Sequence, residues 1–375
     1  MKSNYEPLGK HIRLVDYRNS EEVTSTVLGI SIDKEFMPSV ANVIGTDLSR
    51  YKLISKGLFA CNPMHVGRDE RLPIALYEKD SPAIVSPAYF MFEIIDRDVL
   101  NEEYLMMWFR RPEFDRECWF MTDGSVRGGI TWDDLCRIKL PVPSYARQCE
   151  IVESYRAITD RIALKRAEND NLVNTTDMIF FKMFLEEKPD ATISFTDVVQ
   201  LMGGGTPKTE EESFWNGDVL FFTPKDVSHS PFCISTEKHL TTDGLNNCSS
   251  RLYPPFTTFV TCRGTVGNLS MAGVSMAMNQ SCYALKGKND FPPLFIYSFT
   301  RYVIATMKKK ASGAVFSALV TRDFEMEKVF EPNFGNAILF QKRVEPPFSQ
   351  ILANTNEIQQ LSKLQNALLS RLSSR

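Results

Sequence analysis

The sequence predicts a mixed α/β fold in which two similar domains are each followed by a long helix. Three observations predict it: an internal repeat, a long stretch without helix breakers, and two apolar seams with heptad spacing. The chain of 375 residues has 19 glycines and 20 prolines, yet none lies between Ser144 and Glu187. We therefore expect two duplicated α/β domains separated by two long helices that pair as an antiparallel coiled coil.

Two blocks of sequence recur in the same order along the chain. GLFACNPMHVG at 57–67 aligns with TTFVTCRGTVG at 257–267, where Phe and Gly are shared. DGSVRGGITWDDLCRIKLPVP at 123–143 aligns with SGAVFSALVTRDFEMEKVFEP at 312–332, where Gly, Val, Asp and Pro are shared. Weak identity in a conserved order indicates a duplicated domain.

The segments between these blocks also match. Tyr89 of SPAYFMF stands opposite Tyr283 of QSCYALK. Each copy has short runs rich in β-branched and aromatic residues, punctuated by turn residues, and one helical stretch, at 101–120 and 292–310. Both copies therefore indicate a mixed α/β unit.

Each copy is followed by a heptad seam with polar interruptions. The apolar seam residues predicted to pair are Ile151, Tyr155, Ile158, Ile162, Leu172 and Ile179 in the first helix, and Ile351, Ile358, Leu361, Leu368 and Leu372 in the second. Buried Asn and Gln residues within the seams would fix the register of the pair. The alternative is two surface helices, each packed only on its own domain. At about 1.5 Å per residue, the central helix of ~40 residues would span ~60 Å.

The expected boundaries follow from these patterns. Residues 1–145 form the first repeated domain, 146–190 the central spacer helix, 191–335 the second repeated domain and 336–375 the C-terminal helix.

Composition narrows the class of protein. The net charge is −3, and no segment has the basic excess of an autonomous DNA-binding protein. The eight cysteines form no Cys-x-x-Cys pair, so neither a disulfide framework nor a zinc ribbon is indicated. His229, Cys233 and His239 are the best metal candidates, but a loop histidine beside a buried thiol is favoured, and no metal is expected. No membrane span or secretion signal is evident, so we expect a cytoplasmic protein.

The stretch GGGTPKT at 203–209 resembles a nucleotide-binding loop. That motif requires Gly-Lys-Ser/Thr, whereas Pro207 precedes Lys208 here. A flexible turn is the plain interpretation. A second one is that glycine N–H groups approach a DNA phosphate while Thr206, Lys208 and Thr209 add donors.

Other loop positions carry residue types that contact DNA. Arg can bind guanine and Asn can pair with adenine, each worth ~1–3 kcal/mol of discrimination. Beyond the glycine loop, the candidates are Asn62, His65, Arg68, Ser125 and Arg127 in the first copy, and Thr223, Lys225, Arg263 and Arg322 in the second. For each residue alone, a solvated loop side chain is at least as good an explanation. The basic run at 308–310 is explained by a solvated helix end.

Catalytic signatures are missing. YPPF at 253–256 and EPPF at 345–348 resemble the motif by which DNA amino-methyltransferases hold the target amine, but each has the wrong first residue. A glycine-rich loop for S-adenosylmethionine and a helicase P-loop are also absent. We expect no catalytic residue and no enzymatic activity in this chain.

Taken together, the chain resembles the specificity subunit of a Type I restriction–modification enzyme along its whole length. The matching blocks are NPMHVG (62–67), VSPAYFMFEI (85–94), GSVRGGITWDDLCRIKLPVPSYARQCEIV (124–152), VVQLMGGGTPKTEEESFWNGDVLFFTPKDV (198–227), RGTVG (263–267) and SGAVFSALVTRDFE (312–325). The resemblance implies two target-recognition domains that each read half of a split DNA site. It also implies two paired helices that hold these domains apart and dock methyltransferase subunits.

The resemblance further implies partners and cofactors. The partners would be double-stranded DNA, two modification subunits and restriction/translocase subunits. S-adenosylmethionine, ATP and Mg would belong to those subunits, with no cofactor in this chain. The family's exit into the helix is present as Pro141, Pro143, Gln148 and Ile151, whereas the second copy keeps only Pro332.

Two other classes of function stay open. One is a duplicated coiled-coil scaffold that does not bind DNA. The other is a self-contained DNA methyltransferase or nuclease with unfamiliar motifs.

Overall fold

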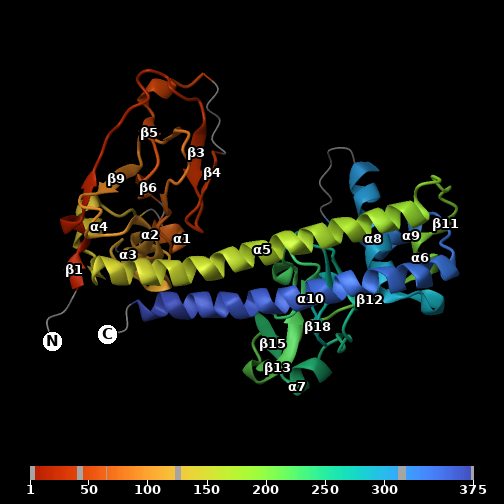
Figure 1. Cartoon of the computed structure of the whole chain (residues 1–375). Helices are drawn as coiled ribbons and strands as arrows, with labels where there is room; N and C mark the ends of the chain where they lie inside the picture. Colours follow the sequence, from red (N-terminus) through yellow and green to blue (C-terminus); the bar gives the residue numbers. More distant parts are fainter. Residues whose placement is uncertain (1–4, 40–44, 65, 123–127, 311–317, 373–375) are drawn as a thin grey trace. The chain divides into compact units, whose positions relative to one another are not determined.

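The computed structural model describes five stretches of the chain, residues 5–39, 45–64, 66–122, 128–310 and 318–372 (Figure 1). The chain divides into two compact units, the first comprising Met1–Asp160 with Ser362–Arg375 and the second Arg161–Leu361. This division passes through both long helices, α5 (Tyr145–Phe184) and α10 (Phe334–Arg371). The boundaries expected from the sequence instead place each helix in a segment of its own.

The first unit contains two four-stranded sheets. One has the order β2-β9-β6-β7 with all neighbours antiparallel, and the other has the order β4-β3-β8-β5 with β3 and β8 parallel. A separate antiparallel pair joins β1 to β10. The strands are β1 (Tyr5–Pro7), β2 (Ile12–Leu14), β3 (Val27–Ile30), β4 (Phe36–Pro38), β5 (Lys52–Ile54), β6 (Phe59–Cys61), β7 (Ile74–Leu76), β8 (Ala83–Val85), β9 (Phe90–Ile94) and β10 (Lys139–Pro141). The helices are α1 (Val66–Asp69), α2 (Glu102–Phe109), α3 (Pro112–Phe120) and α4 (Trp132–Arg137).

The second unit contains a five-stranded sheet, β12-β19-β16-β17-β14, and a three-stranded sheet, β15-β13-β18. A separate pair joins β11 to β20. The strands are β11 (Ile193–Ser194), β12 (Val199–Gly203), β13 (Trp215–Phe222), β14 (Phe232–Cys233), β15 (Lys238–Leu240), β16 (Thr258–Thr261), β17 (Leu269–Ala272), β18 (Ala277–Met278), β19 (Cys282–Gly287) and β20 (Lys328–Val329). The helices are α6 (Phe195–Val198), α7 (Thr242–Asn246), α8 (Pro293–Lys310) and α9 (Thr321–Met326).

The strand pairings of the first unit recur in the second. The order β2-β9-β6-β7 recurs as β12-β19-β16-β17, and the parallel pair β3·β8 recurs as β13·β18. The pair β1·β10 recurs as β11·β20. The two units therefore share one topology, as the internal repeat predicts.

The repeated Asp of the sequence blocks caps a helix in both units. Asp134 accepts from the backbone N of Thr131 at 3.2 Å, at the start of α4. Asp323 accepts from the backbone N of Val320 at 2.8 Å, at the start of α9. A carboxylate at this position satisfies an N–H that the helix itself cannot use. The sequence match between the blocks thus reflects one shared helix start.

Aromatic side chains dominate both cores. In the first unit the rings of Phe59 and Phe92 stack at 5.0 Å between centroids, beneath Phe109 of α2. In the second unit, Phe180 of α5 and Phe340 of α10 meet edge to face at 5.6 Å. The long helices are therefore part of the domain cores.

The two long helices pair antiparallel. In the second unit Arg161 forms an ion pair with Glu357 at 2.7 Å, while Phe180, further along α5, meets Phe340, further back along α10. In the first unit the Nε2 of Gln365 donates to the Oγ1 of Thr159 at 3.0 Å. All eleven seam residues that the sequence singles out are buried or half-buried. The predicted antiparallel pairing is confirmed, and each helix also packs on the domain that precedes it.

Polar residues interrupt the seam in a connected layer within the second unit. Asn354 is 1% exposed and accepts from the Nζ of Lys165 at 2.9 Å. Its own amide donates to the Oδ1 of Asn169 at 2.9 Å, and Gln350 donates to it at 2.9 Å. Buried polar groups that find partners in only one alignment favour that register.

A glutamine near the start of each long helix bonds to the domain before it, one turn further along α10 than along α5. Gln148, in the first turn of α5, is fully buried and accepts from the backbone N of Asn101 at 2.9 Å, just before α2. Gln341 plays the same part for α8, accepting from the N of Leu294 at 3.0 Å. Gln341 lies nine positions after Pro332, whereas Gln148 lies five after Pro143. Because of this difference in spacing, only Pro332 matched the first copy in the sequence comparison.

The EPPF stretch lies inside α10. Pro346 and Pro347 cannot donate to the carbonyls of Lys342 and Arg343, which therefore lack the usual donor four residues later.

No helix in the described stretches is long and apolar enough to cross a bilayer.

Candidate nucleic-acid interface

The candidate loops of the second unit meet around one segment, residues 279–283, which leads into β19. The N of Asn279 donates to the O of Phe222 at 3.0 Å, next to Thr223. The hydroxyl of Thr206 donates to the side chain of Gln280. Loops that follow β12 and β13 are thereby brought to the same edge of the fold.

Two further loops join the same segment. The N of Cys262, beside Arg263, donates to the O of Ser281 at 2.8 Å. The hydroxyls of Tyr283 and Thr321, the latter beside Arg322, lie 3.0 Å apart. Four segments that are distant in sequence, each with a basic residue close to the contact, thus attach to residues 279–283.

Two of the three glycines of GGGTPKT, Gly204 and Gly205, are required by packing within the chain. A Cβ on Gly204 would lie 2.3 Å from the O of Asn279, and one on Gly205 would lie 2.7 Å from the N of Ser249. The N of Gly205 is already bonded to the O of Met278 at 3.2 Å. This N–H is therefore engaged within the chain, and the phosphate contact of the loop stays a prediction.

The side chains of this loop have different fates. Lys208 and Thr209 are exposed, whereas Thr206 is half-buried and bonded to Gln280. The O of Lys208 accepts from the indole N–H of Trp215 at 3.1 Å, which fixes the backbone and leaves the ammonium group in solvent. Lys208 is the residue of this loop best placed to meet an anion.

Thr223 serves its own turn. Its N and its hydroxyl both bond to Asp226 at 2.7 Å, capping the short 3-10 turn Pro224–Asp226. Lys225 lies in that turn and is exposed. The structure therefore gives Thr223 a structural role and presents Lys225 to solvent.

Arg263 and Arg322 are both exposed. Arg263 begins a tight turn in which Gly264 and Gly267 have φ of +78° and +76°, a conformation that favours glycine. Burial raises the pKa of the neighbouring Cys262 to about 12, although the positive charge of Arg263 opposes the shift. Of these two neighbours, only the arginine is charged and accessible.

Both candidate side chains of the first unit that the structure describes, Asn62 and Arg68, already bond to neighbouring groups. The Oδ1 of Asn62 accepts from the N of Met64 at 3.1 Å, forming a local turn. Arg68 binds both carboxylate oxygens of Asp69, at 2.7 and 2.9 Å, and this pairing raises the pKa of Arg68. His65, Ser125 and Arg127 lie outside the described residues.

The sequence analysis missed basic residues near the first unit's counterpart segment, residues 86–89. Lys52 donates to the O of Tyr89 at 2.7 Å, and Arg18 donates to Asp16 at 2.8 Å, which lowers the pKa of Asp16. Arg18 and Arg50 line an open hollow of about 590 Å³. The sequence could have indicated these residues, because 86–89 and 280–283 occupy matching positions in the repeat.

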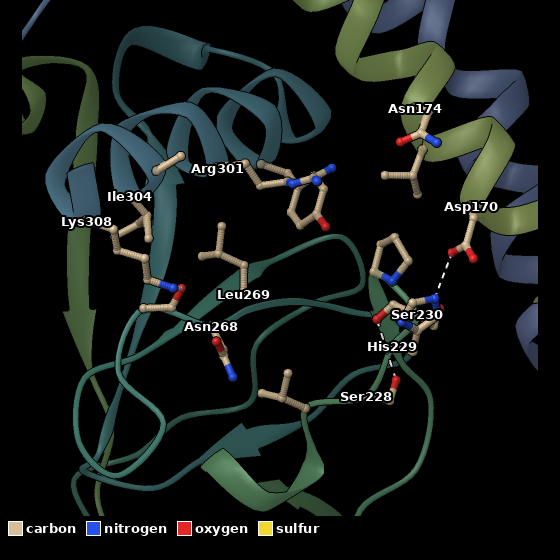
Figure 2. Close-up of a pocket in the computed structure, with 16 residues that line it drawn as sticks. Asp170, Asn174, Ser228, His229, Ser230, Asn268, Leu269, Arg301, Ile304 and Lys308 are labelled. Atoms are coloured by element: carbon tan, nitrogen blue, oxygen red, sulfur yellow. Dashed lines mark hydrogen bonds and ion pairs between the residues drawn. The ribbon is translucent and has the colours of Figure 1, made fainter. Parts of the chain in front are cut away.

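A larger hollow of about 750 Å³ lies between α5, α8 and the loop before β14 (Figure 2). His229 is hydrogen-bonded to Asp170 of α5 at 2.7 Å, so the first metal candidate already has a carboxylate partner. Lys308 of α8 donates to the O of Gly267 at 3.0 Å, which gives the first lysine of the basic run a structural bond. In the described stretches no three His, Cys, Asp or Glu side chains gather as metal ligands would.

Buried thiols do not supply a nucleophile. Burial raises the pKa of Cys233 to about 12, and its thiol donates to the O of Ser235 at 3.1 Å. Cys61 and Cys282 are also buried, and burial raises the pKa of each thiol further. A thiol with a raised pKa is neutral and unreactive at ordinary pH.

These features define a class: a duplicated recognition protein with exposed basic loops and a helix pair. Residues 190–366 match the family model of the type I restriction modification DNA specificity domain. The HindI specificity subunit of Haemophilus influenzae is 28% identical over 186 residues, 48% of this chain and 40% of that protein. The MjaIX specificity subunit of Methanocaldococcus jannaschii is 26% identical over 127 residues, 33% of this chain and 29% of that protein.

A solved S subunit of a Type-I restriction-modification system from M. genitalium shares the fold. It has a TM-score of 0.56 at 14% identity, covering 99% of this chain and 96% of that one. Residues 190–366 therefore match a type I restriction modification DNA specificity domain, and the chain is similar in sequence to Type I restriction enzyme specificity subunits. The matched segments span less than half the length of the two sequence relatives.

Proposed function

We propose that the chain is the non-catalytic specificity subunit of a Type I restriction–modification complex and recognises a bipartite DNA site. The segments that carry the exposed Lys208, Lys225, Arg263 and Arg322 all bond to residues 279–283, and this shared attachment carries the proposal. Exposed cations on adjoining loops suit a phosphate backbone, and arginine also suits guanine in the major groove.

Each unit would read one half-site, because the units share a topology and differ in their loops. The paired helices would set the gap between the half-sites and would dock two modification subunits. Adenine-N6 methylation, with S-adenosylmethionine, would occur in those subunits after the base leaves the stack. Restriction would use ATP and Mg in restriction/translocase subunits. The complex would act in the cytoplasm.

The test is expression with the neighbouring modification subunit, followed by a genome-wide map of N6-methyladenine. We expect a split motif with an unspecified gap. Joint replacement of Lys208, Lys225 and Arg263 by Ala should abolish methylation at that motif. A matched control replaces Lys79, Lys139 and Lys328, which are also exposed and lie outside both long helices, and should leave it intact.

Two outcomes would support the alternatives. A stable complex that methylates nothing and binds no DNA would favour a coiled-coil scaffold. Methylation by the purified chain without any partner would favour a self-contained methyltransferase.

A further inference from the structure

A Ser-Arg dipeptide lies in the same connection of both units. Ser49-Arg50 precedes β5, which pairs antiparallel with β8. Ser250-Arg251 precedes Tyr253, which forms an antiparallel bridge with Met276 next to β18. Because β8 and β18 are equivalent strands, both dipeptides belong to the connection that leads into β6 or β16.

In the first unit this connection is fastened to the loop that follows β2. Asn19 is fully buried, and its amide donates to the O of Leu48 at 3.3 Å while its N donates to the O of Tyr51 at 3.0 Å. Arg18 donates to the O of Arg50 at 2.8 Å. The backbone of the Ser-Arg turn is thus held from both sides.

The side chain of Arg50 is left in solvent. It is 83% exposed, and its Nε lies 3.6 Å from the carboxylate of Asp47, a long ion pair. The neighbouring hollow of about 590 Å³ is lined by Arg18, Ser20, Ser49, Arg50 and Pro87. A hydrogen-bonded turn therefore presents an exposed guanidinium beside an open recess.

The second unit repeats this arrangement against the loop that follows β12. Gly205 packs on Ser249, and the hydroxyl of Tyr253 donates to the O of Gly203 at 2.8 Å. The Oγ of Ser250 accepts from the N of Met278 at 3.1 Å, directly before the 279–283 segment. Arg251 is exposed at this point and opposes the rise in the pKa of Tyr253 that burial causes.

The residues of the two contacting loops differ, whereas the Ser-Arg pair is the same. Residues 17–22 read YRNSEE and residues 203–208 read GGGTPK. Two domains that read different half-sites need different base contacts, but every half-site has the same phosphate backbone. An element kept in both copies therefore suits the part of DNA that is common to both half-sites.

We propose that Arg50 and Arg251 are equivalent phosphate contacts, one for each half-site, each held by a Ser-Arg turn. This inference rests on the proposed function and adds two residues to the site. Such contacts position the DNA and carry no sequence information.

The test uses the chain complexed with its modification subunit and a duplex carrying the mapped site. Arg50→Ala and Arg251→Ala should each reduce the slope of log K against log salt by about one, and the double variant by about two. The methylated sequence should stay the same. Arg50→Lys, which keeps the charge, should retain most of the slope.

Neutral methylphosphonate linkages locate the contact. One such linkage in the first half-site should weaken binding of the unmodified chain and leave binding by Arg50→Ala unchanged; Arg251→Ala should behave likewise for the second half-site. Arg137→Ala, which removes a 72% exposed arginine from α4, should change neither slope nor sequence.

Two results would overturn the inference while the proposed function stands. One is an unchanged salt slope in both alanine variants. The other is a changed base preference in one half-site, which would make the arginine a base reader. If the unmodified complex binds no DNA, the proposed function fails and this inference fails with it.

Discussion

The two units build the same connection in different ways. In the first unit, residues 31–35 join β3 to β4, and the buried Lys34 reaches Asp115 of α3 at 2.6 Å. In the second unit, residues 223–237 join the equivalent strands β13 and β15. This longer connection is fastened to the long helices through His229, which meets Asp170 of α5, and through Ser230.

The comparison shows that topology is kept while the means of fastening changes. The first unit fixes its hairpin with a charged pair in its own core and with a second, exposed pair between Arg71 and Asp33 at 3.1 Å. The second uses the exposed His229–Asp170 contact, a part-buried 2.8 Å bond between Ser230 and Thr355 of α10, and an edge-to-face contact of Phe232 with Phe348 at 6.2 Å between centroids. A single substitution should therefore damage the first connection far more than the second.

The largest expected effect is that of Asp115→Ala. It leaves Lys34 buried without a counter-charge and also removes the acceptor for the N of Leu72 at 3.1 Å. Burial already lowers the pKa of Lys34, and Asp115 opposes that shift. Breaking such a pair costs about 3–5 kcal/mol of unfolding free energy. Denaturant unfolding followed by tryptophan fluorescence suits the measurement, since three of the four tryptophans, Trp108, Trp119 and Trp132, belong to the first unit.

Two controls sharpen this experiment. The joint replacement Lys34→Met with Asp115→Leu removes both charges and should recover most of the loss. Lys56→Ala breaks an ion pair with Asp80 that is fully in solvent and should leave the unfolding midpoint unchanged. If Asp115→Ala leaves the midpoint unchanged as well, the hairpin is held by something other than the ion pair.

Intermediate losses of unfolding free energy are expected at the two glutamines, and the loss should be larger for Gln148→Ala than for Gln341→Ala. Gln148→Ala strands the N of Asn101 and the carbonyls of Val99 and Pro143, which it bonds at 2.9 Å each. Each buried group left unsatisfied costs about 1–3 kcal/mol, so a loss of about 3 kcal/mol is expected. Gln341→Ala removes one described bond and should cost about 1 kcal/mol. Equal losses in the two variants, measured by denaturant titration, would contradict the ranking.

The smallest effect is expected at the second unit's connection. His229 and Asp170 are 73% and 51% exposed, and exposed ion pairs contribute below about 1 kcal/mol. His229→Ala should therefore shift the thermal midpoint by less than Gln341→Ala does. A loss comparable to that of Asp115→Ala would show that the second unit depends on this contact as the first depends on its buried pair.

The fold could be predicted because its signals are periodic and repeated. Heptad spacing identified residues such as Ile162 and Ile351, both of which are buried. The repeat identified Asp134 and Asp323, which turned out to be equivalent helix caps. Gln341 was not predicted because it lies one helical turn further from its preceding proline than Gln148 does, so the two do not align at constant spacing.

The site was less predictable because residue type does not reveal which bonds a side chain already makes. Thr223 and Asn62 have the chemistry of DNA contacts, yet each is bonded within its own turn. The glycines at 204 and 205 are dictated by neighbouring carbonyl and amide groups from distant loops. Arg50 and Arg251 were missed because their importance comes from strand pairing, which no local pattern encodes.

The first unit includes the last turns of α10, so part of its core is synthesised only after the whole second unit. Leu369 and Leu372 pack with Val152 and Tyr155 in the first core, although more than two hundred residues separate them in the chain. At about 5–20 residues per second, a ribosome needs roughly 10–40 s to make the intervening chain. During that time the apolar face of α5 in the first unit lacks the α10 residues that later cover it. The nascent chain should therefore bind holdase chaperones until its C-terminal residues emerge.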